Sequence, residues 1–135
     1  MTSQLVYKGH LRCHLTHLQS GTSIETDAPT DNQGKGERFS PTDLVATALG
    51  ACIVTTMAIL GKNHNINIDG CTCDVEKIMA AHPRRIAEIK INLNFPAEKK
   101  YTDKEKTLLE HIAHTCPVSI SLHPECKQTL IFNWG

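Results

Sequence analysis

An uncharged apolar segment, residues 44–60, most strongly limits what this chain can fold into. Its beginning carries helix signals, because Ser40 can cap a helix, Pro41 suits the first helical position and Asp43 can complete a capping box. Gly61 suits the C-terminal end. The pattern therefore predicts a helix over residues 41–61 that is apolar nearly all round, and such a helix must be covered on most sides.

A chain of 135 residues is one domain by length, so we expect a single domain over residues 1–135. One small domain can hardly cover an all-round apolar helix, and we infer a two-fold homodimer. The segment is about 18 residues long and holds several threonines and glycines, whereas a membrane span needs about 20 predominantly apolar residues. We interpret it as a buried helix and expect no membrane partner.

Charge and targeting signals narrow the class of protein further. The 14 basic and 14 acidic side chains balance, which argues against nucleic acid as a partner. Residues 1–8 lack a basic stretch followed by an apolar one, so we expect a cytoplasmic protein whose six cysteines are reduced.

The remaining pattern predicts strands and one further long helix. Period-two alternation predicts a strand over residues 5–18, followed by a turn at 19–21, a hairpin arm at 22–26 and a polar loop at 28–38. Later strands are expected at residues 65–79, 85–95 and 127–134. Thr102 and Glu105 form a capping-box pattern for a helix reaching Cys116, and Pro117 starts a short helix. This order predicts an α+β fold with an antiparallel sheet around helices.

Two cysteines stand in positions that matter chemically. Cys52 lies mid-helix, where it is either a small buried hydrophobe or a nucleophile. Apolar surroundings would raise its pKa, so a nucleophilic role needs a nearby cation such as one of the four arginines. Cys116 precedes Pro117 and can cap the short helix, where backbone N–H groups would lower its pKa. The alternative is a helix-end cysteine that only packs.

The other cysteines and the histidines give weaker signals. Cys71 and Cys73 project to one face of a strand and could form a strained pair or, with histidines, a zinc site. No second pair completes four zinc ligands, and we expect neither metal nor cofactor. We interpret Cys13 as a residue that packs in the core. We interpret His10, His14 and His17 as a solvated or interface cluster.

Two motifs resemble a known family. The stretch Phe39-Ser40-Pro41-Thr42-Asp43-Leu44 with Ala48-Leu49-Gly50-Ala51-Cys52 is similar to the helix start of the OsmC / organic hydroperoxide resistance family. The stretch Thr115-Cys116-Pro117-Val118-Ser119 resembles that family's second cysteine motif, 64 residues after the first cysteine. The resemblance covers nearly the whole chain, and it implies an OsmC-like fold: an intertwined homodimer with active sites at the subunit interface.

The resemblance also implies an activity in the oxidative stress response. In the family's peroxidases the first cysteine attacks an organic hydroperoxide and becomes a sulfenic acid. Carried over, Cys52 is that nucleophile and Cys116 closes a disulfide with it. A dithiol, which in the family can be a lipoylated protein, then reduces the pair.

The family holds the first thiolate with an arginine and a carboxylate. Arg12 is the match for the arginine. The carboxylate position, ten residues before the first cysteine, is Thr42 here, and Asp43 is turned away by about 100°. Glu37 in the preceding loop is a candidate substitute, and Arg38 is another candidate cation. This departure leaves a second hypothesis open: a dimeric redox-sensing or small-molecule-binding module with little peroxidase activity.

Overall fold

The computed structural model describes residues 1–135, which divide into two compact units, Met1–Val45 and Ala46–Gly135. Each unit has its own three-stranded sheet. The α+β class expected from the sequence is confirmed, with helices beside the sheets. The single domain over residues 1–135 stays a prediction.

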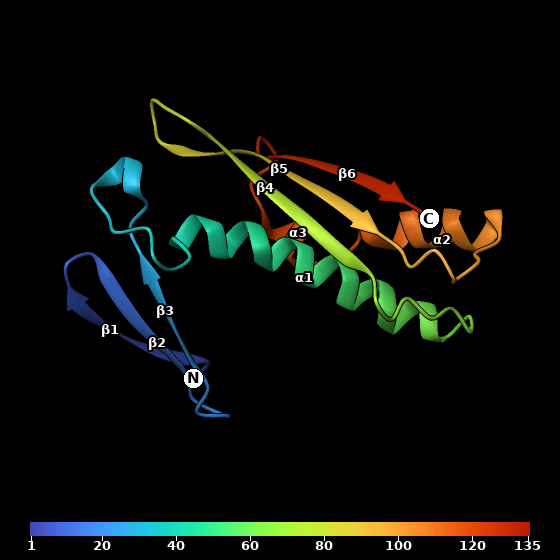
Figure 1. Ribbon diagram of the computed structural model, residues 1–135, viewed down its shortest axis with the longest axis horizontal. Helices are drawn as coiled ribbons and strands as arrows, with labels where there is room; N and C mark the ends of the chain where they lie inside the picture. The colour runs from blue at the N-terminus through green and yellow to red at the C-terminus, as the bar shows by residue number, and fades with distance from the viewer. The chain divides into compact units, whose positions relative to one another are not determined.

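The first unit holds an antiparallel meander with strand order β1-β2-β3 (Figure 1). Its strands are β1 (Ser3–Gly9), β2 (Arg12–His17) and β3 (Ser23–Asp27), followed by the short 3₁₀ helix η1 (Thr30–Asn32). The hairpin of β2 and β3 confirms the arm predicted at residues 22–26, and it sets Arg12 opposite Asp27.

The continuous strand predicted over residues 5–18 is wrong, because a tight turn divides it into β1 and β2. His10 and Leu11 both have left-handed backbone angles, with φ of 55° and 63°. Two such residues make the turn that matches the natural twist of a hairpin. Such a turn usually carries asparagine or glycine, and His10 and Leu11 are neither. The alternating pattern of the sequence therefore gave no sign of the turn.

Helix α1 (Pro41–Lys62) begins as the sequence predicts. The backbone N–H of Asp43 donates to Ser40 Oγ at 3.0 Å, and the backbone N–H of Ser40 donates to Asp43 Oδ2 at 3.0 Å. These reciprocal bonds satisfy two backbone donors that the helix start would otherwise leave without partners. They also explain why Asp43 is committed to the cap.

The second unit holds a mixed sheet with strand order β4-β5-β6. Its strands are β4 (Thr72–Ala80), β5 (Arg85–Asn94) and β6 (Lys127–Asn133). β4 and β5 pair antiparallel as expected, whereas β5 and β6 pair parallel, which corrects the prediction of a wholly antiparallel sheet. Parallel neighbours need a long crossover connection.

That crossover contains two helices. Helix α2 (Asp103–Ala113) starts at Thr102 with the predicted capping box to Glu105, and it ends three residues before Cys116. Helix α3 (Pro117–Ser121) follows at once, so the crossover carries Cys116 between its two helices.

The hydrophobic core of the second unit forms where α1 meets the sheet and α2. A Cβ placed on Gly50 would lie 3.3 Å from a Val75 methyl, so the absence of a side chain lets α1 approach β4 closely. Near the other end of α1, Gly61 lies against Ile66 and Leu109. The largest fully buried apolar side chains are Leu49, Ile53, Met57, Ile89, Ile91, Leu93 and Leu109.

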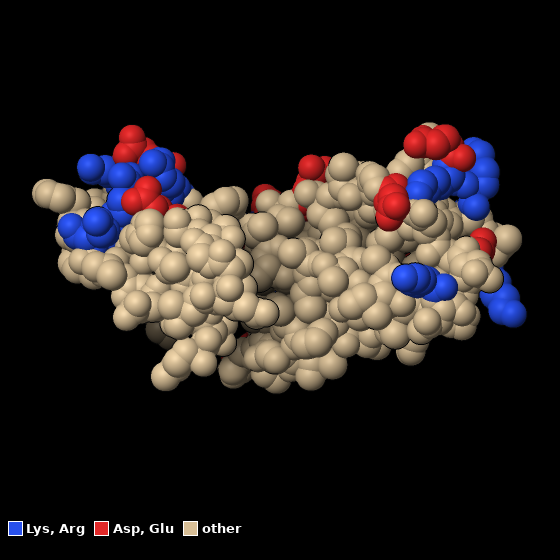
Figure 2. All heavy atoms as spheres, turned by 90° about the horizontal axis from the view of Figure 1, so that it is seen from below, with Lys and Arg blue, Asp and Glu red and all other residues tan.

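Within the second unit, no other element covers the opposite side of α1. Figure 2 views the second unit from the side on which α1 lies in Figure 1, and most of the surface seen there is uncharged. Ile59 of α1 is 61% exposed and Leu60 39% exposed. By length and composition α1 could cross a membrane, but its inner face is buried in the core, as in the central helix of a soluble protein.

Candidate functional site

Cys52 lies in the second half of α1, half-buried against the core. Its neighbour on the same face is Thr56, one turn later, whose Oγ1 is 4.0 Å from the Cys52 sulfur. Because α1 is long and capped at its start, Cys52 is held on a rigid element rather than on a loop.

Cys116 caps helix α3, as its place before Pro117 predicts. Its backbone is extended, with φ −68° and ψ 146°, and its sulfur accepts a hydrogen bond from the backbone N–H of Ser119 at 3.3 Å. The side chain is fully buried. The predicted cap is therefore confirmed.

Strand β6 holds this cap in place. Gln128 Nε2 donates to the backbone carbonyl of Ser119 at 3.0 Å, and Ser119 Oγ donates to Gln128 Oε1 at 2.5 Å. Ser119, whose N–H binds the Cys116 sulfur, is thus held by two hydrogen bonds to Gln128 of β6.

The fold brings the two sulfurs together. Hydrogen bonding with the Cys116 thiol and with the backbone of Val118, in the first turn of α3, helps to lower the pKa of Cys52, so the two cysteines meet at one place. Both cysteines are free thiols. Residues 64 positions apart thereby form one dithiol site, between the middle of α1 and the start of α3.

The pKa values of the two thiols move in opposite directions. Burial raises the pKa of Cys52, but hydrogen bonds from the Val118 N–H, the Cys116 thiol and the Thr56 hydroxyl outweigh burial and lower it below its ordinary value. Burial raises the pKa of Cys116, and its bond to Cys52 raises it further. Both directions reverse what position along the chain suggested, because the interaction between the two cysteines favours the thiolate of Cys52 and the protonated form of Cys116.

This asymmetry predicts how Cys52 responds to pH. Iodoacetamide should alkylate Cys52 with a half-maximal rate below pH 9.0, the ordinary value for a thiol, because only the thiolate reacts. Thr56→Val should move that midpoint upward by removing one hydrogen bond, while Thr55→Val, on the exposed neighbour, should leave it in place. Mass spectrometry of the Cys52 peptide measures both. A midpoint at or above 9.0 in the wild type contradicts the assignment.

Arg12 is held by carboxylates within the first unit. Its Nε and Nη2 donate to the two carboxylate oxygens of Asp27 at 2.7 and 2.8 Å, and Nη2 also donates to Glu37 Oε1 at 3.2 Å. Asp27 is 1% exposed and receives a third bond from the Glu37 backbone N–H. The hydrogen bond from Arg12 lowers the pKa of Asp27, and the same bond raises the pKa of Arg12.

Sequence reasoning missed Asp27. The signal that could have found it is the register of the hairpin, which sets it opposite Arg12. Glu37, named as a candidate acid, does contact Arg12, whereas Arg38 pairs with Glu25 at 3.2 Å. Arg12 belongs to the first unit and Cys52 to the second. The role of Arg12 toward Cys52 stays a prediction.

Thr42 stands where the resemblance implies an acid. Its Oγ1 lies 3.2 Å from Ser40 Oγ, so it belongs to the polar group at the start of α1.

Among the histidines expected to cluster, His17 Nδ1 lies 2.6 Å from Ser20 Oγ. No three His, Cys, Asp or Glu side chains come together as a metal site.

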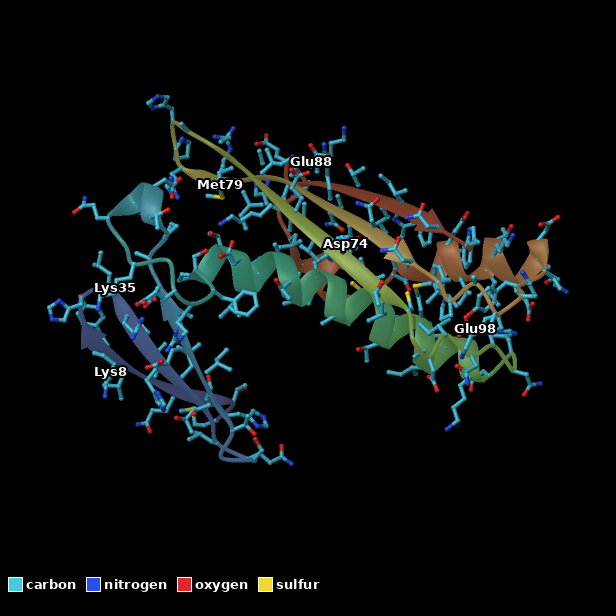
Figure 3. All side chains as sticks on the ribbon, in the orientation of Figure 1. Lys8, Lys35, Asp74, Met79, Glu88 and Glu98 are labelled. Carbon is cyan, nitrogen blue, oxygen red and sulfur yellow. The ribbon has the colours of Figure 1, made fainter.

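A second pair of thiols lies at the start of β4. Cys71 and Cys73 are both half-buried, and the Cys71 thiol donates to the backbone carbonyl of Thr72 at 3.8 Å. Next to them, Asp74 of β4 is exposed, is labelled in Figure 3, and accepts a hydrogen bond from Asn94 Nδ2 at 3.1 Å. This pair was expected from the sequence only as a strained pair or part of a metal site.

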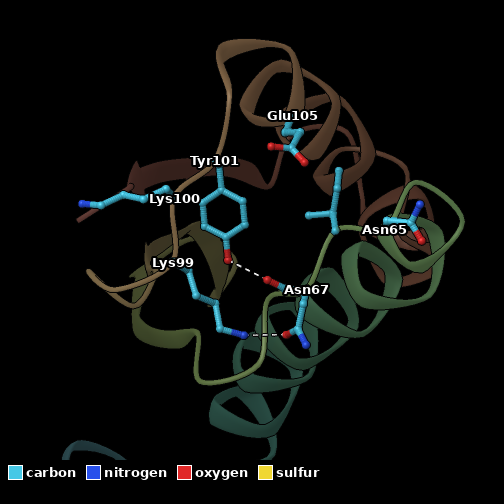
Figure 4. A pocket seen from close by; sticks show the side chains of 7 residues that line it. Asn65, Asn67, Lys99, Lys100, Tyr101 and Glu105 are labelled. Atoms are coloured by element: carbon cyan, nitrogen blue, oxygen red, sulfur yellow. Dashed lines mark hydrogen bonds between the residues drawn. The ribbon is translucent and has the colours of Figure 1, made fainter.

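A pocket of about 270 Å³ opens between the start of α2 and the turn before β4 (Figure 4). Tyr101 donates to the backbone carbonyl of Asn67 at 2.8 Å, and Lys99 donates to the Asn67 side chain at 2.6 Å. The pocket is lined by Asn65, Ile66, Asn67, Lys99, Lys100, Tyr101 and Glu105, and therefore contains no cysteine.

Comparison with known proteins gives the dithiol site a context. The sequence model for the family described as OsmC-like protein matches residues 34–130, a stretch that includes both Cys52 and Cys116. No curated protein matches the chain.

Several solved structures share the fold. A protein of Psychrobacter arcticus 273-4, named for osmotic stress induction and a detoxification response, is 46% identical with a TM-score of 0.92; the match covers 98% of this chain and 95% of that one. The organic hydroperoxide resistance protein OsmC of Legionella pneumophila is 17% identical with a TM-score of 0.76, covering 98% and 97%. An organic hydroperoxide resistance protein of Elizabethkingia anophelis is 18% identical with a TM-score of 0.77, covering 100% and 97%.

Proposed function

Because this chain belongs to the OsmC-like protein family, we propose that it is a thiol-dependent peroxidase that reduces organic hydroperoxides. The observation that carries this proposal is the meeting of Cys52 with Cys116 at the start of α3, where hydrogen bonding with Val118 and Cys116 lowers the pKa of Cys52 despite its burial. A thiolate is the reactive form of cysteine, and these bonds favour it. The names of the Legionella and Elizabethkingia structures agree with the substrate class.

The first step is attack of the Cys52 thiolate on the distal oxygen of the hydroperoxide. The O–O bond breaks, the distal oxygen stays on sulfur as a sulfenic acid, and the alkoxide takes a proton to leave as an alcohol. In the second step the Cys116 sulfur attacks the sulfenic sulfur, the S–O bond breaks, and water leaves with the Cys116 proton. A dithiol reductant, such as a lipoylated protein, then exchanges with the Cys52–Cys116 disulfide and restores both thiols.

The opposite pKa shifts suit these two roles. Cys52, with its lowered pKa, is the nucleophile, and Cys116, with its raised pKa, keeps its proton until the sulfenic acid has formed. Arg12 is proposed to stabilise the Cys52 thiolate and orient the peroxide. Its guanidinium is fixed by Asp27, which supplies the carboxylate partner that Thr42 cannot.

The active assembly is proposed to be a homodimer. Several large apolar side chains of the first unit are exposed, among them Leu5, Val6, Tyr7 and Ile24, and so is Ile59 on α1. Monomeric proteins rarely expose large contiguous apolar surface. A second copy of the chain that covers these residues accounts for them.

The test uses the wild-type protein, fully reduced and free of other thiols. One equivalent of cumene hydroperoxide should be consumed rapidly and leave one Cys52–Cys116 disulfide, identified by non-reducing peptide mass spectrometry. With dihydrolipoamide present, consumption should continue over many equivalents. Slow oxidation spread over all six cysteines, with no sustained consumption under any dithiol, contradicts the proposal.

Thr42 favours a second candidate, a redox-sensing or small-molecule-binding module of the same fold. A hydroperoxide resistance protein of Vibrio cholerae, 12% identical, has captopril bound in one of its active sites. A module of this kind would form the Cys52–Cys116 disulfide without sustained turnover. The dihydrolipoamide arm of the test above separates the two functions.

A further inference from the structure

Gln128 is a polar side chain on the face of β6 that packs against the core. Residues two apart in a strand point to the same face, so Gln128 shares this face with Leu130 and Phe132, which both pack against the core. Its partner across the parallel ladder is Ile89 of β5, which is fully buried. Burying an amide costs free energy unless its polar atoms are hydrogen-bonded, so a glutamine in this apolar series needs a partner.

That partner is Ser119 of α3, which binds both ends of the Gln128 amide. Gln128 Nε2 donates to the backbone carbonyl of Ser119 at 3.0 Å, and Ser119 Oγ donates to Gln128 Oε1 at 2.5 Å. One planar amide group makes both bonds, so it fixes the backbone and the side chain of Ser119 together.

Ser119 in turn binds the sulfur of Cys116. Its backbone N–H donates to Cys116 Sγ at 3.3 Å, and the N–H of Ile120 donates to the Cys116 carbonyl at 3.1 Å. Hydrogen bonds therefore connect Gln128 through Ser119 to the Cys116 sulfur. The direction of this sulfur depends on a backbone group whose position β6 fixes.

The direction of the Cys116 sulfur matters in the second step of the proposed mechanism. A disulfide needs two sulfurs about 2.05 Å apart and a dihedral angle near 90°, so the Cys116 sulfur must approach the sulfenic sulfur of Cys52 along a narrow path. An error of about 1 Å in placing a reacting group can cost about a hundredfold in rate. The first step involves the Cys52 sulfur and the peroxide, and it needs no such placement of Cys116.

We propose that Gln128 is a positioning residue for this second step, in which it holds the Cys116 sulfur, through Ser119, where it can condense with the Cys52 sulfenic acid. The inference rests on the proposed peroxidase function and adds a residue of the last strand to it. Because the bonds of Gln128 are to Ser119 and not to either sulfur, its loss should slow the formation of the disulfide and leave the attack on peroxide unchanged.

The test compares Gln128→Leu with the wild type, each as the full chain, reduced and mixed with one equivalent of cumene hydroperoxide and excess dimedone. Leucine suits the apolar series but removes both bonds to Ser119. Peroxide should be consumed at the wild-type rate. Peptide mass spectrometry should find that the ratio of dimedone-labelled Cys52 to Cys52–Cys116 disulfide rises at least about tenfold, because dimedone and Cys116 compete for the same sulfenic acid.

Thr129→Val is the matched control in the same strand. It removes the hydrogen bond from the Thr129 hydroxyl to Glu88 Oε2 but leaves both bonds to Ser119, so the ratio should stay at the wild-type value. Ser119→Ala removes one bond to Gln128 and keeps the N–H that binds Cys116, and it should raise the ratio about threefold. Adding Ser119→Ala to Gln128→Leu should change nothing further, since the partner of the hydroxyl is already gone.

The inference is overturned if Gln128→Leu keeps the wild-type ratio, or if Thr129→Val raises the ratio as much. Both results leave the peroxidase proposal standing, because the wild type still forms its disulfide. A wild type that forms no Cys52–Cys116 disulfide overturns the peroxidase proposal and this inference with it. If Gln128→Leu does not fold, judged by circular dichroism, Ser119→Ala decides, and an unchanged ratio in that variant overturns the inference.

Discussion

Replacing Cys52 with serine is expected to lower the rate of cumene hydroperoxide consumption by more than about a thousandfold, to the uncatalysed background. Serine keeps the shape of the side chain but has no accessible anionic form near neutral pH. The hydrogen bonds from Val118 and Cys116 then have no thiolate to stabilise. The measurement is peroxide consumption with dihydrolipoamide as reductant.

Replacing Cys116 with serine should give a different defect. The first equivalent of peroxide should still be consumed, because Cys52 keeps the Val118 N–H, but the sulfenic acid should accumulate since no second thiol can condense with it. Dimedone should label Cys52 in this variant and not in the wild type.

Cys13→Ser is the matched control, because this cysteine lies in β2 and outside the Cys52–Cys116 pair, and turnover should be unchanged. Equal turnover in Cys52→Ser and wild type would remove Cys52 from the mechanism. If Cys52→Ser abolishes turnover but Cys116→Ser does not slow it, the resolving thiol is another one.

Replacing Leu49 with alanine is expected to lower the free energy of unfolding by about 3 kcal/mol. Leu49 is fully buried on the inner face of α1, so the change leaves a cavity in the core of the second unit. For a chain of this size the midpoint of thermal unfolding should fall by about 10 °C. Urea and thermal unfolding followed by circular dichroism measure the two quantities.

Ile59→Ala is the control on the same helix, because Ile59 is 61% exposed in the single chain. Its effect should stay within about 0.5 kcal/mol at protein concentrations low enough to dissociate a dimer. A cost for Leu49→Ala below about 1 kcal/mol would contradict the assignment of α1 as the central core helix.

Local signals in the sequence predicted most of the helices. Ser40 and Asp43 mark the start of α1, and Thr102 with Glu105 marks the start of α2, because capping involves residues only three apart. The same locality explains Cys116, whose capping role follows from the proline after it.

These local signals could not predict contacts between residues far apart in the sequence. The parallel pairing of β5 with β6 depends on a crossover of two helices, and strand pattern alone does not give direction. The bidentate contact of Asp27 with Arg12 depends on hairpin register. The direction of the Cys52 pKa required knowing that Val118 and Cys116 meet it in space, because burial alone predicts the opposite.

Two hydrogen bonds join Gln128 to Ser119, so the position of the turn beside Cys116 depends on β6, the last strand of the chain. The Ser119 N–H binds the Cys116 sulfur, and interaction with Cys116 in turn lowers the pKa of Cys52. A chain that stops before Lys127 keeps all six cysteines but loses the side chain that fixes this turn. During synthesis Ser119 therefore leaves the ribosome before Gln128, and the two hydrogen bonds that hold the turn beside Cys116 can form only after β6 has emerged and paired with β5.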